Sequence, residues 1–143
     1  MLRSWRLTGL ALAIGVFAVG ASLAGGSTAV AVVEIVVFAA LAFVWSPLAF
    51  PRSGGAADAR QRSRLDGRPV IYWRPGCTYC QRLRLRLGRQ GRRAHWVNIW
   101  ADPEGAAAVR AITGGNETVP TVEVDGQSHV NPDPSWVRDR LRA

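Results

Sequence analysis

The chain has 143 residues, a strongly basic balance of 18 arginines against ten acidic residues, and no lysine. Once its long apolar stretches are set apart, room remains for one small domain, which excludes a large multidomain enzyme. The positive charge suggests nucleic acid or anionic lipid as a partner. Because arginines flank the apolar stretches, lipid is favoured and no nucleic-acid partner is expected.

Two apolar stretches open the chain. Residues 7–24 carry no charge, and residues 29–50 contain a single acid, Glu34. Each is long enough to cross the hydrocarbon core of a bilayer, and the Gly25-Gly26-Ser27-Thr28 segment between them is typical of a tight turn. We therefore expect residues 1–50 to form a transmembrane helical hairpin with spans over 7–24 and 29–50. A cleavable signal peptide over residues 1–26 is the alternative.

The arginines near the hairpin predict its orientation. Arg3 and Arg6 precede the first span and Arg52 follows the second, whereas the turn has no charge. The positive-inside rule then places both ends of the hairpin in the cytoplasm. We expect a multi-pass protein of the cell membrane whose soluble part faces the cytoplasm.

Two further features of the hairpin concern its interior. Small residues at a spacing of four would let the helices approach closely; they are Gly9, Ala13, Gly20 and Ala24. Glu34 either reaches the outer interface or is protonated, with a functional intramembrane acid as the alternative.

Residues 51–68 are rich in Arg, Ala and Gly and are interpreted as a linker with a short helical patch, followed by a soluble domain over 69–143. Apolar periodicity and turn residues predict its elements in the order strand, helix, strand, helix, strand, strand, helix. Their expected ranges are 69–73, 77–90, 94–100, 102–113, 119–124, 127–130 and 133–142. This βαβαββα order predicts an α/β fold with a parallel strand pair joined to an antiparallel hairpin.

The "QRLRLRL" stretch alternates with a period of two, which by itself would indicate a strand. A helix is favoured because Cys80, Leu83 and Leu87 fall on one helical face and because Leu and Arg are good helix formers.

The chain's two cysteines, Cys77 and Cys80, stand at the end of the first expected strand and the start of the first helix. Helix N-termini stabilise a thiolate, which is the reactive form of cysteine. A structural zinc site needs four ligands as a rule, and the two histidines, His95 and His129, have the wrong spacing, so no metal is expected. A structural disulfide is disfavoured in a reducing cytoplasm. A CxxC motif near a βαβ pattern indicates a thioredoxin-like redox site.

Three stretches of the soluble part, "GCTYC", "GGNETVPTVEVDG" and "NPDPSWV", resemble glutaredoxins, and more closely the mycothiol-dependent branch called mycoredoxins. The resemblance covers residues 69–141. It implies a thioredoxin/glutaredoxin-like domain and a cis peptide bond between Val119 and Pro120. It also implies a thiol-disulfide oxidoreductase that reduces mixed disulfides between proteins and a small thiol. The expected hairpin would anchor this oxidoreductase to the membrane.

The resemblance also implies roles for individual residues. Cys77 would attack the mixed disulfide, and Cys80 would be optional or would resolve Cys77 as a disulfide. The small thiol would be bound by Arg74, Tyr79, Val119, Pro120, Asn131 and Asp133. Arg74 as a solvated charge, Asp133 as a plain helix cap and Tyr79 as a rim residue are the alternatives. No bound cofactor is expected; mycothiol, or else glutathione, would be the co-substrate.

Other functions remain open at this point. The domain would otherwise be a thioredoxin-like protein disulfide reductase fed by a flavoprotein, a non-catalytic adaptor, or an iron–sulfur carrier. Its expected clients are thiolated or disulfide-containing proteins, membrane proteins among them. Six arginines between positions 82 and 93 are interpreted as a solvated helix face, or as a surface that meets a partner or the membrane.

Overall fold

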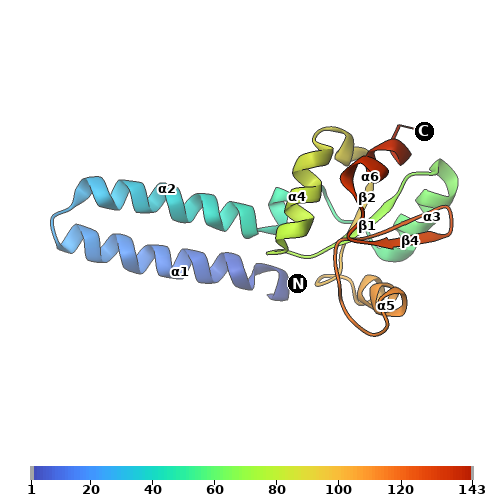
Figure 1. The fold of residues 1–143 in the computed structure, drawn as a ribbon. Coiled ribbons are helices and arrows are strands. Elements are labelled where there is room, and N and C mark those ends of the chain that lie inside the picture. Colours follow the sequence, from blue (N-terminus) through green and yellow to red (C-terminus); the bar gives the residue numbers. More distant parts are fainter. Residues whose placement is uncertain (1, 143) are drawn as a thin grey trace. The chain divides into compact units, whose positions relative to one another are not determined.

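A computed structural model describes residues 2–142 (Figure 1). Met1 and Ala143 lie outside that description, as do the side chains of Leu2, Arg3, Ser4 and Pro47. The chain divides between Ala49 and Phe50 into two compact units.

The first unit consists of two antiparallel helices, α1 (Leu2–Ala24) and α2 (Thr28–Trp45), and a short 3-10 turn, η1 (Pro47–Ala49). Both helices are long and apolar enough to cross a membrane, with a mean hydropathy of 2.1 for Trp5–Ala24 and 2.4 for Thr28–Trp45. Large apolar side chains point outward; Phe17 is 80% exposed. The second helix ends at Trp45, earlier than the expected boundary at residue 50, because Ser46 adopts extended backbone and caps the helix.

The face of α1 that meets α2 differs from the expected one. A side chain on Gly9 or Gly20 would have open space around it, whereas a Cβ on Gly15 would lie 2.8 Å from the Cβ of Phe38. Thr8 and Ala11 are buried with Gly15. Their spacing of three and four places these three residues on one helix face, so the expected stripe at Gly9 and Gly20 is wrong.

A polar contact joins the two helices near their turn. The Ser22 hydroxyl donates a hydrogen bond of 2.9 Å to the Glu34 carboxyl group. A buried or lipid-facing polar group is costly unless it is hydrogen-bonded. The contact therefore gives the single acid of the expected spans a partner within the hairpin.

The second unit is built on a mixed four-stranded sheet in the order β2-β1-β3-β4. The strands are β1 (Val70–Trp73), β2 (His95–Asn98), β3 (Thr121–Val124) and β4 (Gln127–Val130). β1 runs parallel to β2 and antiparallel to β3, which pairs in turn with β4 in an antiparallel hairpin. The expected α/β class and the βαβαββα order are confirmed.

The helices of this unit are α3 (Ala56–Asp66), α4 (Thr78–Leu87), α5 (Pro103–Ile112) and α6 (Pro134–Arg140), with a 3-10 turn η2 (Gln90–Arg93) after α4. α4 packs against α6, and α3 packs against α5. Trp96 contacts Gly91 of η2, whereas its neighbour Val97 meets Gly105 of α5. Because successive strand residues point to opposite faces, these contacts place η2 and α5 on opposite sides of the sheet.

The helical interpretation of the "QRLRLRL" stretch is confirmed. Cys80, Leu83 and Leu87 of α4 are buried, whereas Leu85 is 80% exposed. Asp102 and Asp133 cap α5 and α6, as their Asp-Pro pairs predict.

Residues 51–68, expected to be a linker, are part of the packed domain. Phe50 stacks on Trp73 with ring centroids 3.8 Å apart. The Asn98 backbone N–H donates to the Ser53 hydroxyl at 2.6 Å, so this segment covers the open edge of β2. Ala56 and Ala59 bury one face of α3. The sequence does not indicate that α3 packs on the domain, because α3 is rich in arginine and its packed face consists of only two alanines.

Candidate active site

The active-site loop joins β1 to α4. Cys77 is the N-cap of α4, and its sulfur accepts a hydrogen bond of 3.2 Å from the Cys80 backbone N–H. Gly76 has a φ of +76°, a conformation that glycine adopts without steric cost. The turn at Gly76 therefore brings the Cys77 sulfur to the helix N-terminus, where backbone N–H groups and the helix dipole favour a negative charge.

The two thiols have different acidities. A hydrogen bond from the Cys80 side chain is the largest effect that lowers the pKa of Cys77, to about 7, and the Cys80 backbone N–H and the Arg74 charge act in the same direction. Burial raises the pKa of Cys80, and the neighbouring Cys77 raises it further. Both cysteines are free thiols; Cys80 is buried and Cys77 is partly exposed. Cys77 is therefore the thiol better suited to nucleophilic attack, whereas Cys80 is buried and less acidic.

This difference predicts the pH dependence of alkylation. The rate at which iodoacetamide modifies Cys77 should rise with pH around a midpoint near 7 and level off above it, because only the thiolate reacts and the folded-state pKa is lowered. In Cys80→Ala, which removes the side-chain donor, the midpoint should move up toward the value of about 8.5 typical of a free cysteine. Mass spectrometry of the modified peptide measures both profiles. An unchanged midpoint in Cys80→Ala would show that this hydrogen bond does not set the acidity.

Val119 and Pro120 lie directly opposite Cys77. The peptide bond between them is cis, which confirms the expectation from the resemblance. The Cys77 thiol donates to the Val119 carbonyl at 3.4 Å, and both Val119 and Pro120 are buried. The loop before β3 therefore forms a wall beside the reactive sulfur.

Arg74 connects the active-site loop to this wall. Its guanidinium group donates to the Glu117 carbonyl at 3.4 Å and lies 5.8 Å from the centre of the Trp100 ring. The Glu117 carboxylate in turn pairs with Arg110 of α5. The Arg74 side chain is thus held by its neighbours rather than free in solvent, and its positive charge favours the Cys77 thiolate.

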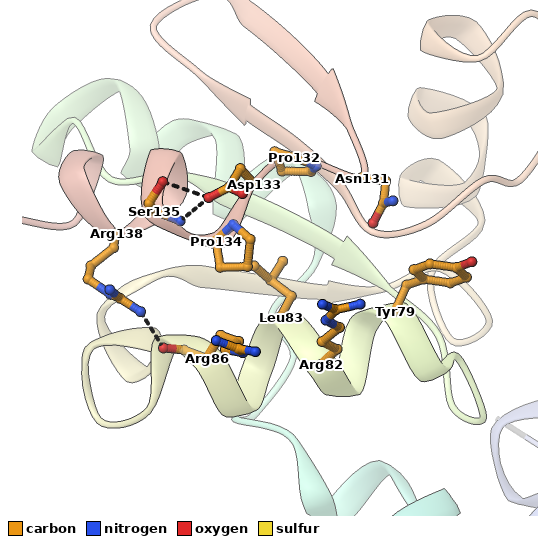
Figure 2. A pocket seen from close by; sticks show the side chains of 10 residues that line it. All are labelled: Tyr79, Arg82, Leu83, Arg86, Asn131, Pro132, Asp133, Pro134, Ser135 and Arg138. Atoms are coloured by element: carbon orange, nitrogen blue, oxygen red, sulfur yellow. Dashed lines mark hydrogen bonds between the residues drawn. The ribbon is translucent and has the colours of Figure 1, made fainter.

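The other expected thiol-binding residues line a cavity of about 510 Å³ between α4 and the start of α6 (Figure 2). Tyr79 stands at one end of the cavity near Asn131, and Asp133 lies farther from Tyr79, beside Ser135. Asp133 accepts hydrogen bonds from the backbone N–H of Ser135 at 2.7 Å and from its hydroxyl at 2.6 Å. These bonds lower the pKa of the Asp133 carboxyl group, so it is both a helix cap and a fixed negative charge in the cavity.

Three arginines that the sequence analysis did not assign to the site also line this cavity: Arg82, Arg86 and Arg138. Arg82 and Arg86 follow Tyr79 at positions three and seven along α4, so helical spacing alone could have placed them on the same face. Arg138 donates to the Arg86 carbonyl at 2.7 Å and comes from α6. Its position depends on how α6 packs on α4, which no local pattern shows.

Two contacts fix the loop that forms the cavity's far wall. The Asn131 backbone N–H donates to the Pro120 carbonyl at 2.7 Å, which joins the loop to the wall beside Cys77. The ring of Trp136, in α6, lies 4.1 Å from the ring of His129, in β4. The six expected binding residues therefore lie in two groups, Arg74 with the Val119–Pro120 wall and Tyr79 with the Asn131–Asp133 loop.

No cluster of three or more His, Cys, Asp or Glu side chains within residues 2–142 is placed to hold a metal ion. Cys77 and Cys80 are hydrogen-bonded as a pair of thiols. The Cys77 thiol donates to the Val119 carbonyl, and the Cys77 sulfur accepts hydrogen bonds from the backbone N–H and the side chain of Cys80.

Comparison with known proteins agrees with this geometry. A family profile described as Glutaredoxin matches residues 70–130, from the first residue of β1 to the end of β4. Two proteins of Mycobacterium tuberculosis, from strains CDC 1551 / Oshkosh and ATCC 25618 / H37Rv, are each named "Putative glutaredoxin". Each is 36% identical over 73 residues, which is 50% of this chain and 87% of the relative. The chain therefore belongs to the glutaredoxin family of thioredoxin-fold thiol oxidoreductases.

Proposed function

We propose that this protein is a membrane-anchored thiol-disulfide oxidoreductase that reduces mixed disulfides between proteins and a small thiol, with mycothiol as that thiol. The observation that supports it most is the Cys77 thiol, which has a pKa near 7, a helix N-terminus beneath it and the Val119 carbonyl beside it. The resemblance of "GGNETVPTV" and "NPDPS" to the mycothiol branch, with two mycobacterial relatives, favours mycothiol over glutathione.

The reaction has two exchange steps. The Cys77 thiolate attacks the small-thiol sulfur of the mixed disulfide, the old S–S bond breaks, and the client leaves as a thiolate that takes a proton from water. A second molecule of the small thiol, as its thiolate, then attacks the sulfur of the small thiol that is bound to Cys77. This step releases the small thiol's own disulfide and restores the Cys77 thiolate.

The residues around the sulfur suit these steps. Arg74 and the helix N-terminus stabilise the thiolate that leaves in the second step. The Val119–Pro120 wall and the cavity beyond Tyr79 hold the rest of the small thiol beside Cys77. Asp133 and the cavity arginines offer charged and hydrogen-bonding groups to its polar part.

Comparing electron donors tests the proposal. With a protein–mycothiol mixed disulfide as substrate, we expect rapid reduction with mycothiol as donor, slower reduction with glutathione, and none with a thioredoxin-reductase-type flavoprotein and NADPH. The readout is release of the free client thiol, followed by mass spectrometry. Reduction by the flavoprotein alone would instead support a thioredoxin-like protein disulfide reductase, for which the buried Cys80 one helical turn from Cys77 is the favouring observation.

We further propose that α1 and α2 span the cell membrane and that the redox domain faces the cytoplasm. The support is the hydropathy of both helices, the uncharged turn between them, and the arginines at both outer ends. A thiol-dependent reductase also needs a reducing thiol pool, which the cytoplasm supplies.

Reporter fusions after Ala143 test this topology. A reporter active only in the cytoplasm should function there, and a reporter active only outside the cytoplasm should be silent. A matched pair of fusions after Ser27, in the turn, should give the opposite pattern. Activity of the external reporter after Ala143 would place the domain outside and contradict a reducing role.

A further inference from the structure

A second hollow of about 350 Å³ lies on the redox domain and shares no lining residue with the cavity beside Tyr79. We name it the arginine hollow after the five arginines among its lining residues: Arg52, Arg62, Arg68, Arg92 and Arg93. They come from separate segments, namely the chain before α3, α3 itself, the α3–β1 connection and η2. Only the fold brings these segments together, so the hollow is a tertiary feature rather than a run of like charges.

Acidic neighbours compensate only part of this charge. Asp58 lies in the hollow and pairs with Arg62 at 2.9 Å. Asp66 pairs with His95 at 2.9 Å and lies 3.9 Å from Arg68. The other three arginines, Arg52, Arg92 and Arg93, are exposed and form no ion pair within residues 2–142. Three guanidinium groups are therefore available to an external ligand.

The chemistry of these groups indicates a phosphate. A guanidinium group presents a planar fork of N–H donors that matches two phosphate oxygens, and clusters of arginines are typical sites for anionic phosphate groups. The hollow has a volume of about 350 Å³, which suits a headgroup rather than a large folded ligand.

The position of the hollow in the chain favours a lipid phosphate. Only four residues separate Trp45, the last residue of α2, from Phe50, which is anchored in the domain core by Trp73. Arg52 follows two residues later. Clusters of basic residues immediately cytoplasmic of a transmembrane helix are typical of sites for anionic lipids. The surface potential of these lipids attracts the basic residues within a Debye length of the bilayer, about 8–10 Å.

We propose that the arginine hollow binds the phosphate headgroups of anionic phospholipids and thereby holds this face of the redox domain on the membrane surface. The inference rests on the proposed membrane anchor. A domain bound in this way has a fixed orientation toward clients in the same membrane.

The fragment 50–143 allows a direct test, because it is a compact unit with its own buried core. It should sediment with vesicles of phosphatidylcholine and phosphatidylglycerol but not with phosphatidylcholine alone, and added salt should weaken binding. Each arginine near an anionic surface contributes about fivefold in partitioning, so Arg92→Gln with Arg93→Gln should lower it by about 25-fold.

The matched control is Arg64→Gln with Arg142→Gln, which removes the same charge outside the hollow and should lower partitioning much less. Equal losses in the two double variants would mean that net charge alone drives binding and would overturn the proposal. Absence of wild-type binding to anionic vesicles would also overturn it. So would release from vesicles by inorganic phosphate at constant ionic strength, or tighter binding to RNA, since these assign the hollow to a soluble anion or a nucleic acid.

A measurement on the full chain covers the case of a fragment that does not fold. In nanodiscs with anionic lipid, an arginine-selective dicarbonyl reagent should modify Arg92 and Arg93 more slowly than in neutral nanodiscs, while Arg64 and Arg142 react equally in both. Equal reactivity of all four in both lipids contradicts the proposal. The hollow variants should retain reduction of a soluble mixed disulfide, so failure of lipid binding and failure of the proposed redox activity are separate results.

Discussion

We expect Cys77→Ser to lower turnover of a protein–small-thiol mixed disulfide to the uncatalysed rate. The serine hydroxyl remains protonated near neutral pH, so the variant lacks the thiolate that attacks the disulfide. The loss should be the same for every electron donor, because Cys77 is the sulfur that the helix N-terminus, the Cys80 hydrogen bond and Arg74 all favour as thiolate. Release of the client thiol measures the rate.

The matched variant is Cys80→Ser, which should retain turnover of small mixed disulfides. Its hydroxyl can still donate to the Cys77 sulfur, and the two-step cycle needs only one thiolate. A protein disulfide without a small thiol requires a resolving thiol, so Cys80→Ser should lose that activity. Near-normal turnover by Cys77→Ser, or complete loss in Cys80→Ser with mixed disulfides, would show that the roles are assigned incorrectly.

We expect Phe50→Ala to destabilise the redox domain by about 3–5 kcal/mol, the usual cost of truncating a buried phenylalanine. Phe50 is only 8% exposed, stacks on Trp73 at 3.8 Å and meets the edge of Trp96 at 5.5 Å. Its removal leaves a cavity against two large core rings. Urea unfolding of the fragment 50–143, followed by tryptophan fluorescence, measures the change.

Leu65→Ala provides the control, because Leu65 is 82% exposed and its truncation should change stability by less than about 0.5 kcal/mol.

A shorter fragment, 69–143, should be far less stable than 50–143, since it loses Phe50, α3 and the Ser53 hydroxyl that accepts a hydrogen bond at the edge of β2. Equal stability of the two fragments would restore the linker interpretation of residues 51–68.

Local patterns in the sequence were enough to predict the strand and helices that surround the two cysteines. The strand before Cys77, the helix after it and the Asp-Pro starts of α5 and α6 depend on neighbours in the chain, because capping and helical spacing act over a few residues. The same holds for the two apolar helices, whose length and hydropathy are properties of composition. The cis bond before Pro120 was anticipated from the family resemblance rather than from any local pattern.

Tertiary packing decided the rest. The sequence by itself determined that Cys77 stands at a helix N-terminus, but only the fold places the Val119 carbonyl 3.4 Å from its sulfur, since the two residues are 42 positions apart in the chain. Composition made 51–68 resemble a linker, yet Ala56 and Ala59 pack against the domain, because two small side chains suffice where α3 approaches closely. The arginine hollow likewise draws on segments 40 residues apart, from Arg52 to Arg92. Local patterns show which residues can share a helix face, whereas long-range contacts depend on which faces the whole chain buries.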